Sequence, residues 1–311
     1  MPSAELDEPR APGAAPGTPL YESHYLTATA PEGGRAVWLR YTADKHAGGP
    51  PEGTLWCTAF TSGRAPVQRR EAVAGRLAVP PAGVWARIGE SEIAPGRATG
   101  GVADCRWDVT WTAEAEPVPY LPARFLYDRS VPRSNGVALV PSARLAGTVD
   151  VAGEPIDLTG WRGMVGHNWG RDHAEQWVWL HAGGLADRDG DGWFDLVLAR
   201  VRLGPLLTPW IATGALQLDG ERRALGGPAT ALRGVRVEDQ GERLRVELPG
   251  GVLVETTSPA TDTATWDYAS PAGPGRLVRN CSIADGTITL SGRTPLEVRG
   301  GFAVELGRPA G

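Results

Sequence analysis

Short runs in which apolar and polar residues alternate, bounded by Gly and Pro, constrain the fold most strongly. Residues 105–111 place Cys, Trp, Val and Trp on one face and Arg, Asp and Thr on the other. Side chains of a β-strand alternate between the two faces of its sheet, so this run predicts a half-buried strand. Residues 244–248 repeat the pattern, and the Pro-Gly-Gly that follows them leads into residues 252–256, which predicts a hairpin.

Similar runs recur along the chain at a spacing of roughly 8–12 residues, whereas helical periodicity is scarce. The 42 Gly and 27 Pro residues gather between these runs. Many short strands at this spacing are typical of sandwiches and barrels. We therefore predict an all-β chain with two antiparallel domains, 21–172 and 173–311, after a disordered tail over residues 1–20. Further strands are expected at 36–42, 54–60, 84–88, 147–151, 176–185, 194–203, 211–218, 275–283, 287–290 and 302–306.

The composition argues against several classes of protein. A hydrophobic content of 41% can build a core, and a net charge of −5 with scattered arginines argues against a nucleic-acid binder. The three cysteines, Cys57, Cys105 and Cys281, form no C-x-x-C pair, so we expect reduced, buried thiols.

The chain also lacks the marks of export, membrane insertion and nucleotide binding. Its first residues do not resemble a secretory signal, and no apolar run approaches the ~18 residues of a membrane span. The glycine patterns that bind phosphates or dinucleotides are absent. We expect a cytoplasmic protein that uses no nucleotide, nicotinamide or metal cofactor.

Residues 166–181 gather most of the side chains that can carry chemistry. This segment holds three of the five His and three of the twelve Trp. His exchanges protons near neutral pH, and indole faces stabilise a desolvated cation by up to ~2 kcal/mol. The combination suits reactions that pass through a developing carbocation, such as hydration or cyclisation of an unsaturated molecule. The candidates are His167, Asn168, Trp169, Asp172, His173, Glu175, Trp177, Trp179 and His181.

The expected strand at 176–185 separates these candidates. Trp177, Trp179 and His181 would share one face with Glu175, and the residues between them are suited to packing. Glu175 and His181 would lie about 20 Å apart and would need partners from other strands or from the turn expected at 167–173. The alternative is structural, with buried Trp and His satisfied by backbone carbonyls.

Two metal hypotheses stay open from the residues alone. His167, His173 and His181 could converge on an ion, although their spacing matches no common zinc motif. Residues 187–195 resemble the first half of a calcium loop, but the twelfth position is Leu198 and no helices flank it. A polar hairpin turn is the alternative for that segment.

The chain resembles the lipocalin-like superfamily of carotenoid 1,2-hydratase (hydroxyneurosporene synthase), AttH-type proteins and tocopherol cyclase. Residues 160–170 and the Trp177/Trp179 strand carry the resemblance most strongly, because they are similar to the Asp-His-(Asn/Gln)-Trp-Gly signature. Weaker matches lie at residues 36–41, 53–56 and 280–284. One departure stands out: Gly166 replaces the acid that precedes the signature His.

The resemblance implies two consecutive antiparallel lipocalin-like β-barrel domains with a cavity for an apolar ligand in or between them. It also implies hydration or cyclisation of isoprenoid or polyketide-like molecules without a cofactor. We expect His167, Asp172, His173 and His181 to be catalytic. Contact with the substrate would come from Asn168, Trp169, Glu175, Trp177 and Trp179. The alternatives are a non-catalytic carrier or sensor of a hydrophobic ligand, and a structural role in which the motif closes the domain interface.

Overall fold

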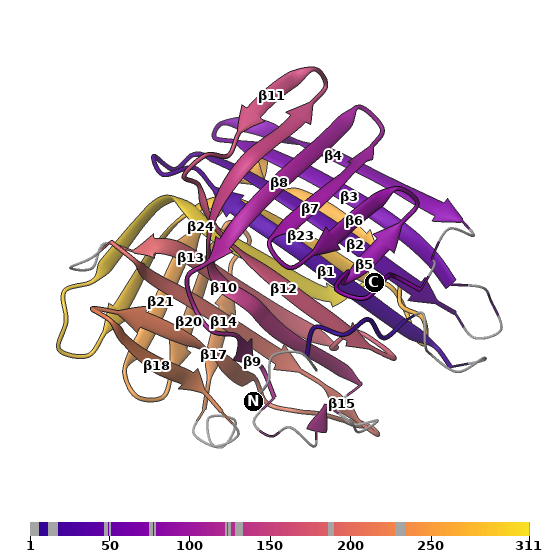
Figure 1. Ribbon diagram of the computed structural model, residues 1–311. Coiled ribbons are helices and arrows are strands. Elements are labelled where there is room, and N and C mark those ends of the chain that lie inside the picture. Colours follow the sequence, from indigo (N-terminus) through magenta and orange to yellow (C-terminus); the bar gives the residue numbers. More distant parts are fainter. Residues whose placement is uncertain are drawn as a thin grey trace.

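The chain folds into two large antiparallel β-sheets that lie against each other (Figure 1). The computed structural model describes residues 6–11, 18–46, 49, 51–74, 77, 79–121, 123, 126–127, 133–185, 190–227 and 234–310. In this part of the chain no α-helix is present, and one 3-10 turn, η3, spans Ala260–Asp262. The prediction of an all-β chain built from two lipocalin-like β-domains is confirmed.

The N-terminal sheet is built from residues 20–170 in the order β4-β3-β2-β1-β12-β10-β8-β7-β6-β5, with β9 and β11 paired to β10. The sheet curls on itself: β3 and β5 lie near opposite ends of the strand order, yet Gly53 on β3 packs closely against Ile88 on β5. Its strands are β1 (Leu20–Thr29), β2 (Arg35–Lys45), β3 (Pro51–Thr61), β4 (Arg64–Ala74), β5 (Ala86–Ile88), β6 (Ser91–Ala94), β7 (Arg97–Val102), β8 (Cys105–Ala113), β9 (Val118–Pro119), β10 (Ser134–Val151), β11 (Glu154–Asp157) and β12 (Arg162–Gly170).

The C-terminal sheet follows the order β18-β17-β14-β13-β24-β23-β21-β20-β19, with β22 paired to β23 and a separate β15–β16 hairpin. Residue 172, where we divide the chain, falls between β12 and β13. The strands are β13 (Gln176–Leu185), β14 (Gly192–Arg200), β15 (Arg202–Leu203), β16 (Leu206–Leu207), β17 (Ile211–Leu218), β18 (Glu221–Gly226), β19 (Arg236–Asp239), β20 (Arg243–Leu248), β21 (Val252–Thr257), β22 (Ala264–Tyr268), β23 (Arg276–Leu290) and β24 (Leu296–Pro309).

The two sides of the N-terminal sheet have different roles. Its inner face holds a large apolar core that includes Leu26, Leu39 and Val165. Its outer face turns toward the C-terminal sheet, where Tyr25 and Met164 belong to a small apolar cluster shared by both sheets. Because both faces of β1, β2 and β12 are buried, these strands show little polar alternation in the sequence.

One expectation about the central motif is wrong. We expected a turn at 167–173, but residues 162–170 form β12, in the middle of the N-terminal sheet. Strand β12 pairs with β1 on one side and β10 on the other, and His167 lies opposite His24 and Val137. The alternation of a strand therefore sends His167 and Asn168 to opposite faces of the sheet.

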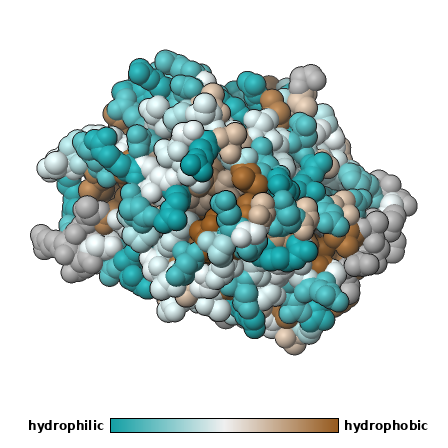
Figure 2. Space-filling model, turned by 90° about the horizontal axis from the view of Figure 1, so that it is seen from above, coloured by the Kyte–Doolittle hydropathy of each residue, from teal (hydrophilic) through white to brown (hydrophobic). Residues whose placement is uncertain are grey.

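The surface of the protein is mainly hydrophilic, and hydrophobic side chains lie in recesses near the middle of the face in Figure 2. Large exposed hydrophobic residues among those described are Val79, Leu203 and Leu206. No described helix is long and apolar enough to cross a membrane. All three cysteines are buried and unpaired, as expected.

Part of the predicted disordered tail is packed. Residues 6–11 lie against the inner face of the N-terminal sheet, where Leu6 and Ala11 are buried. The indole Nε1 of Trp85 donates a hydrogen bond of 3.1 Å to Asp7. The remaining residues before 18 are outside the described part of the chain.

Candidate functional site

A cavity of about 930 Å³ lies between the two sheets. Strands β1, β2, β9, β10 and β12 contribute to one wall, and β13, β14, β17, β18, β22 and β24 to the other. We call this space the intersheet cavity. Its volume is within the range of pockets that enclose a small organic molecule. Leu203, on the β15–β16 hairpin, lines the cavity and is 53% exposed, so the cavity reaches the surface there.

The candidates predicted from the sequence are divided between this cavity and the core of the N-terminal sheet. Asn168, His173, Trp177 and Trp179 line the cavity. In contrast, His167 and Trp169 point from the other face of β12 into the apolar core, where their rings stack with centroids 4.5 Å apart. The structure thus brings together only part of the predicted constellation.

A buried carboxylate, Asp195 on β14, is held by two residues that line the cavity. The hydroxyl of Tyr120 donates to Asp195 Oδ2 over 2.8 Å, and the indole of Trp179 donates to Oδ1 over 3.0 Å. Asp195 itself is fully buried. Because Tyr120 comes from the N-terminal sheet and Asp195 from the C-terminal one, this arrangement joins the two domains.

His181 lies beside this carboxylate. Its Nδ1 is 3.6 Å from Asp195 Oδ1, which is longer than a hydrogen bond. Neither ring nitrogen has a hydrogen-bond partner, although the side chain is 3% exposed. Polar groups buried without a partner are rare in folded proteins. His181 is therefore a second buried polar group, next to Asp195, with unused hydrogen-bonding capacity.

Two tyrosines, Tyr25 and Tyr120, line the cavity in the region of Asp195. Burial, reinforced by the charge of Asp195, raises the pKa of both Tyr25 and Tyr120 well above that of a free phenol. The two tyrosines belong to one apolar cluster, which both sheets share. Both tyrosines are thus neutral hydroxyls that line the cavity next to a carboxylate.

Glu305 on β24 forms a second polar centre in the cavity wall. Its carboxylate accepts a hydrogen bond of 2.9 Å from Trp177 Nε1 and one of 3.2 Å from the Tyr268 hydroxyl. The Asn280 amide donates a third, also 3.2 Å long. Three neutral groups thus donate hydrogen bonds to Glu305, and the bond from Trp177 fixes the indole ring in the wall.

His173 belongs to the same end of the cavity. Its ring lies 4.1 Å from that of Tyr21 and 5.8 Å from that of Trp177, measured between centroids. Burial, together with the charge of Arg40, lowers its pKa to about 3. Its Nε2 is 3.1 Å from the carbonyl oxygen of Ala269, so a proton on Nε2 leaves Nδ1 as an acceptor. His173 is therefore a neutral ring at neutral pH.

Asp172 and Glu175 do not line the cavity. The Ser270 hydroxyl donates to Asp172 over 2.5 Å, and Arg276 lies 3.7 Å from the same carboxylate. Glu175 pairs with Arg202 at 2.6 Å, and this contact lowers the pKa of Glu175. The two acids hold the link between β12 and β13 in place.

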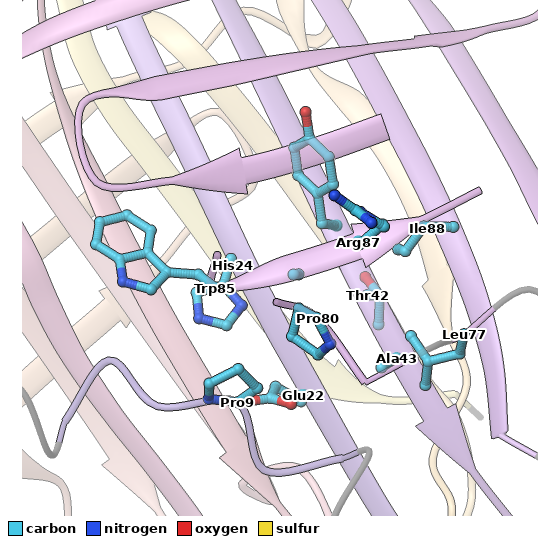
Figure 3. Close-up of a pocket in the computed structure, with 12 residues that line it drawn as sticks. Pro9, Glu22, His24, Thr42, Ala43, Leu77, Pro80, Trp85, Arg87 and Ile88 are labelled. Atoms are coloured by element: carbon cyan, nitrogen blue, oxygen red, sulfur yellow. The ribbon is translucent and has the colours of Figure 1, made fainter. Parts of the chain in front are cut away.

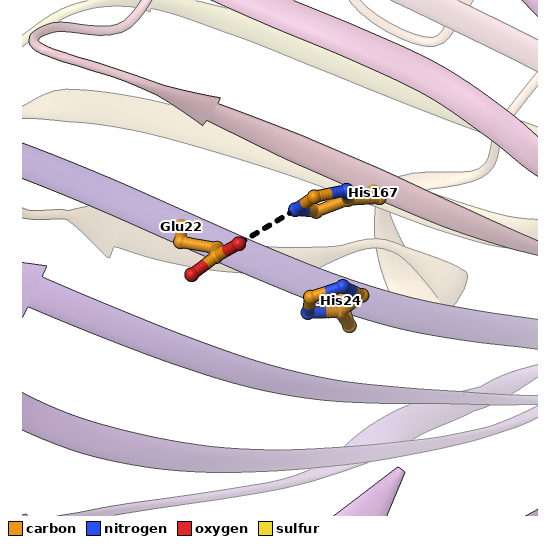
Figure 4. A group of neighbouring side chains, drawn as sticks. All are labelled: Glu22, His24 and His167. Carbon is orange, nitrogen blue, oxygen red and sulfur yellow. Dashed lines mark hydrogen bonds and ion pairs between the residues drawn. The ribbon is translucent and has the colours of Figure 1, made fainter. Parts of the chain in front are cut away.

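A separate polar cluster lies on the inner face of the N-terminal sheet (Figures 3 and 4). The ring of His167 bridges the carbonyl oxygen of Leu6, 2.8 Å from Nδ1, and Glu22 Oε1, 2.8 Å from Nε2. Glu22 also accepts hydrogen bonds from the backbone N–H groups of Arg10 and Ala11. His167 thus fastens the N-terminal segment to the sheet.

This cluster is the group of described residues that offers three ligand atoms for a metal ion, namely Glu22, His24 and His167. The rings of the two histidines are stacked, with centroids 4.0 Å apart and planes 10° apart. Lone pairs of imidazole lie in the ring plane, so two stacked rings cannot both point at one ion unless His24 turns. The triad His167, His173 and His181 does not converge either, because these residues lie in three different places.

Only two of the four aspartates in the predicted calcium loop lie among the described residues. Asp187 and Asp189 lie outside the described residues. Asp191 pairs with Arg162 at 2.8 Å, and Asp195 points into the domain interface.

Sequence reasoning missed Asp195, which lies behind the cavity wall, and several residues that line the cavity. The strongest omission is Asp195, which we interpreted as the end of an aspartate-rich turn. A usable signal was present, because Trp193, Asp195 and Val197 alternate with Phe194 and Leu196, so an acid stands on one face of a largely apolar strand. The others are Tyr25, Arg40, Tyr120, Tyr268 and Glu305.

Two lipocalin-like β-domains with a cavity between them define the class of protein. Two solved structures share the fold. An AttH-like protein from Nitrosomonas europaea has a TM-score of 0.59 at 16% sequence identity and covers 93% of this chain and 92% of that chain. Kievitone hydratase from Nectria haematococca has a TM-score of 0.57 at 11% identity and covers 100% of this chain and 93% of that chain. The resemblance inferred from the sequence is confirmed at the level of the fold.

Particular relatives are found among curated proteins as well. Two uncharacterized proteins of Mycobacterium tuberculosis, from strains CDC 1551 / Oshkosh and ATCC 25618 / H37Rv, are each 27% identical over 285 residues. The aligned part is 88% of this chain and 82% of each relative. No family model matches the chain.

Proposed function

We propose that this protein is a cofactor-independent enzyme that binds a largely apolar, unsaturated small molecule in the intersheet cavity. It promotes hydration, cyclisation or isomerisation of that molecule. The observation that carries the proposal is the buried carboxylate of Asp195, which accepts hydrogen bonds from two residues of the cavity wall, Tyr120 and Trp179. The shared fold with kievitone hydratase, an enzyme named for a hydration, supports the reaction class.

The proposed chemistry runs through the hydroxyl of Tyr120. Tyr120 gives its proton to a double bond of the substrate and receives one from the protonated Asp195. The carbocation then faces the rings of Trp177 and Trp179, which stabilise positive charge through their π faces. Hydrogen bonds from Tyr120 and Trp179 to Asp195 stabilise the carboxylate that is left.

The second half of the reaction returns the proton. In hydration, water adds to the cation and loses a proton to Tyr120, which passes its own to Asp195. In isomerisation, the cation loses a different proton along the same route. The proposal differs from the sequence-based hypothesis by moving the acid–base role from His167 to Asp195 and Tyr120.

The test is turnover by Asp195→Asn and Tyr120→Phe. An apolar extract of cells that carry the gene, and kievitone as a defined probe, are incubated with each protein and analysed by mass spectrometry. Wild type should form a product heavier by one water, or an isomer of equal mass. Loss of a general acid–base group lowers the rate by about 10²–10⁴-fold. The matched control is Asp108→Asn, which removes a carboxylate from the exposed face of β8. Equal rates in wild type and both variants would sink the assignment.

A carrier or sensor of a hydrophobic ligand is the second candidate. The mainly apolar wall of the cavity, with Val197, Ile211 and Leu121 among its residues, favours it, because such a wall binds without chemistry. A compound that co-purifies with wild type and with Asp195→Asn, and is released unchanged from both, would establish this function.

A further inference from the structure

Arg40 brings a positive charge without an ion-pair partner into the intersheet cavity. It stands on the outer face of β2, lines the cavity and is 5% exposed. Its Nε donates a hydrogen bond of 2.6 Å to the hydroxyl of Ser23. In the part of the chain that the structure describes, no carboxylate forms an ion pair with it. Burial of an unpaired charge is strongly unfavourable, so a buried guanidinium is normally paired.

Aromatic rings hold the guanidinium in place. Its carbon lies 4.1 Å from the ring centroid of Tyr268, 5.6 Å from that of Trp56 and 5.8 Å from that of Trp38. These cation–π contacts stabilise the charge and fix its position, but they supply no anion for the N–H groups. The guanidinium is thus presented to the cavity with its charge unmatched.

The neighbouring acids do not form an ion pair with Arg40 in the described part of the chain. Glu305 forms no ion pair with Arg40 among the described residues, and it already accepts three hydrogen bonds. Asp44 lies four residues further along the same face of β2; burial raises its pKa and the charge of Arg40 opposes that rise, but the two groups form no ion pair in the described part of the chain. The other arginine of the cavity wall, Arg222, donates to the carbonyl oxygens of Glu116 and Pro117. Among the described residues, Arg40 has no such carbonyl or carboxylate partner.

We infer that the molecule that occupies the cavity carries a planar oxygen anion at one end, a carboxylate or an ionised phenol or enol, and that this group docks on Arg40. The inference rests on the proposed function for the identity of the cavity, and it adds the substrate class. A planar anion matches the fork of a guanidinium and can accept two of its N–H groups at once.

This docking would also orient the substrate. Ser23, which binds Arg40, and Tyr25 are neighbours on the outer face of β1, about 7 Å apart. Tyr25 belongs to the same apolar cluster as Tyr120, the proposed proton donor, and both residues line the cavity. An anionic end fixed at Arg40 would therefore place the apolar tail beside Tyr120 and along the wall of Trp177 and Trp179.

The experiment compares two fluorescent probes that share one ring system. 8-Anilinonaphthalene-1-sulfonate carries an anion, and N-phenyl-1-naphthylamine does not. Wild type should bind the sulfonate more tightly by roughly tenfold or more, the effect of a charged hydrogen bond. Arg40→Met should abolish this preference and leave the Kd of the neutral probe within about twofold. The matched control is Arg70→Met, because Arg70 also stacks on Trp56, at 4.9 Å, but does not line the cavity.

Equal affinities of the two probes for wild type, or an unchanged preference in Arg40→Met, would overturn the inference. Failure of both probes to bind would overturn it too, together with the cavity on which the proposed function depends. If Arg40→Met does not fold, dodecanoate and dodecanol are compared as displacers of the neutral probe from wild type, and equal displacement would count against the inference. An anion preference that depends on Arg40, with turnover unaffected by Asp195→Asn, would reject the catalytic proposal alone.

Discussion

A side chain at Gly166 would collide with the ring of Tyr25. The two residues lie opposite each other on β12 and β1, and a Cβ at Gly166 would be 2.2 Å from Tyr25 Cζ and 2.4 Å from its hydroxyl. The resemblance places an acid at this position. Here the ring of Tyr25 fills that space, and the buried carboxylate of Asp195, on the opposite sheet, accepts a hydrogen bond from Tyr120 at the same interface.

This relationship predicts that Gly166→Asp is strongly destabilising. The new side chain would overpack the interface and bury a carboxylate, at a cost of about 3 kcal/mol or more in the free energy of unfolding. The double variant Gly166→Asp/Tyr25→Ala should be less destabilised than the sum of the two single variants, because Tyr25→Ala vacates the space. Urea denaturation of the two single variants and the double variant measures this coupling. Wild-type stability of Gly166→Asp would contradict the close contact.

Residues at 176–185 and 211–218 form strands with the bounds that the sequence predicts. Each run is apolar enough to be buried, and an Asp follows it within two residues, so local pattern decides where it ends. The strand β12 escaped prediction for the opposite reason. Both of its faces are buried, and the polar residues His167 and Asn168 point to different compartments, so no alternation marks it.

Only part of the candidate site could be predicted from the sequence, because the rest depends on how the two sheets pack. Sequence identifies the chemistry of the segment around His173, Trp177 and Trp179, because unusual residues gather there. Asp195 and Tyr120 meet only because two sheets pack face to face, and their separation of 75 residues carries no sign of the contact. Local pattern gives the direction of a side chain relative to its strand, and the packing of the sheets decides what that side chain meets.

The hydrogen bonds to Asp195 predict non-additive effects on catalysis. Tyr120→Phe should slow turnover by about 10²-fold, since it removes the group proposed to transfer the proton. Asp195→Asn should cause a loss of similar size. The double variant should be little slower than either single one, because the two groups act as one unit. Steady-state kinetics on the product identified by mass spectrometry measure this, and multiplied losses would show that the residues act independently.

The half-buried ring of His173 predicts acid-sensitive stability. Its pKa is lowered to about 3 in the folded protein, mainly by burial, whereas an unfolded His titrates near 6.5. Between these values the unfolded chain binds more protons, so the stabilising effect is full above pH 6.5 and is lost as the pH falls toward 3. His173→Phe keeps a ring and removes the titration.

The slope of unfolding free energy against pH should therefore be smaller in His173→Phe than in wild type, by up to about 1.4 kcal/mol per pH unit. His24 titrates in the same direction and Asp44, whose pKa burial raises to about 6, in the opposite one. Both are present in wild type and variant, so the difference between the two slopes isolates His173. Identical slopes would show that His173 is accessible to protons in the folded state.

His167 is predicted to stabilise the fold through the N-terminal segment. Both of its partners, the Leu6 carbonyl and the Glu22 carboxylate, are acceptors, and the pair is buried. His167→Ala would leave Glu22 without its ring partner, and loss of one partner of a buried pair costs about 3–5 kcal/mol. Chemical denaturation should show this loss. In a chain that lacks residues 1–11, the same substitution should cost less, because the link to Leu6 is already gone.

The same variant separates the two roles proposed for this residue. Assayed well below its melting temperature, His167→Ala should keep the turnover of wild type if Asp195 and Tyr120 transfer the proton, because His167 lies on the other face of β12 from the cavity. His167→Gln serves as the matched variant, since an amide can still donate to one of the two acceptors. If both variants turned over about a hundredfold more slowly with the folded fraction unchanged, the acid–base role expected from the sequence would be restored.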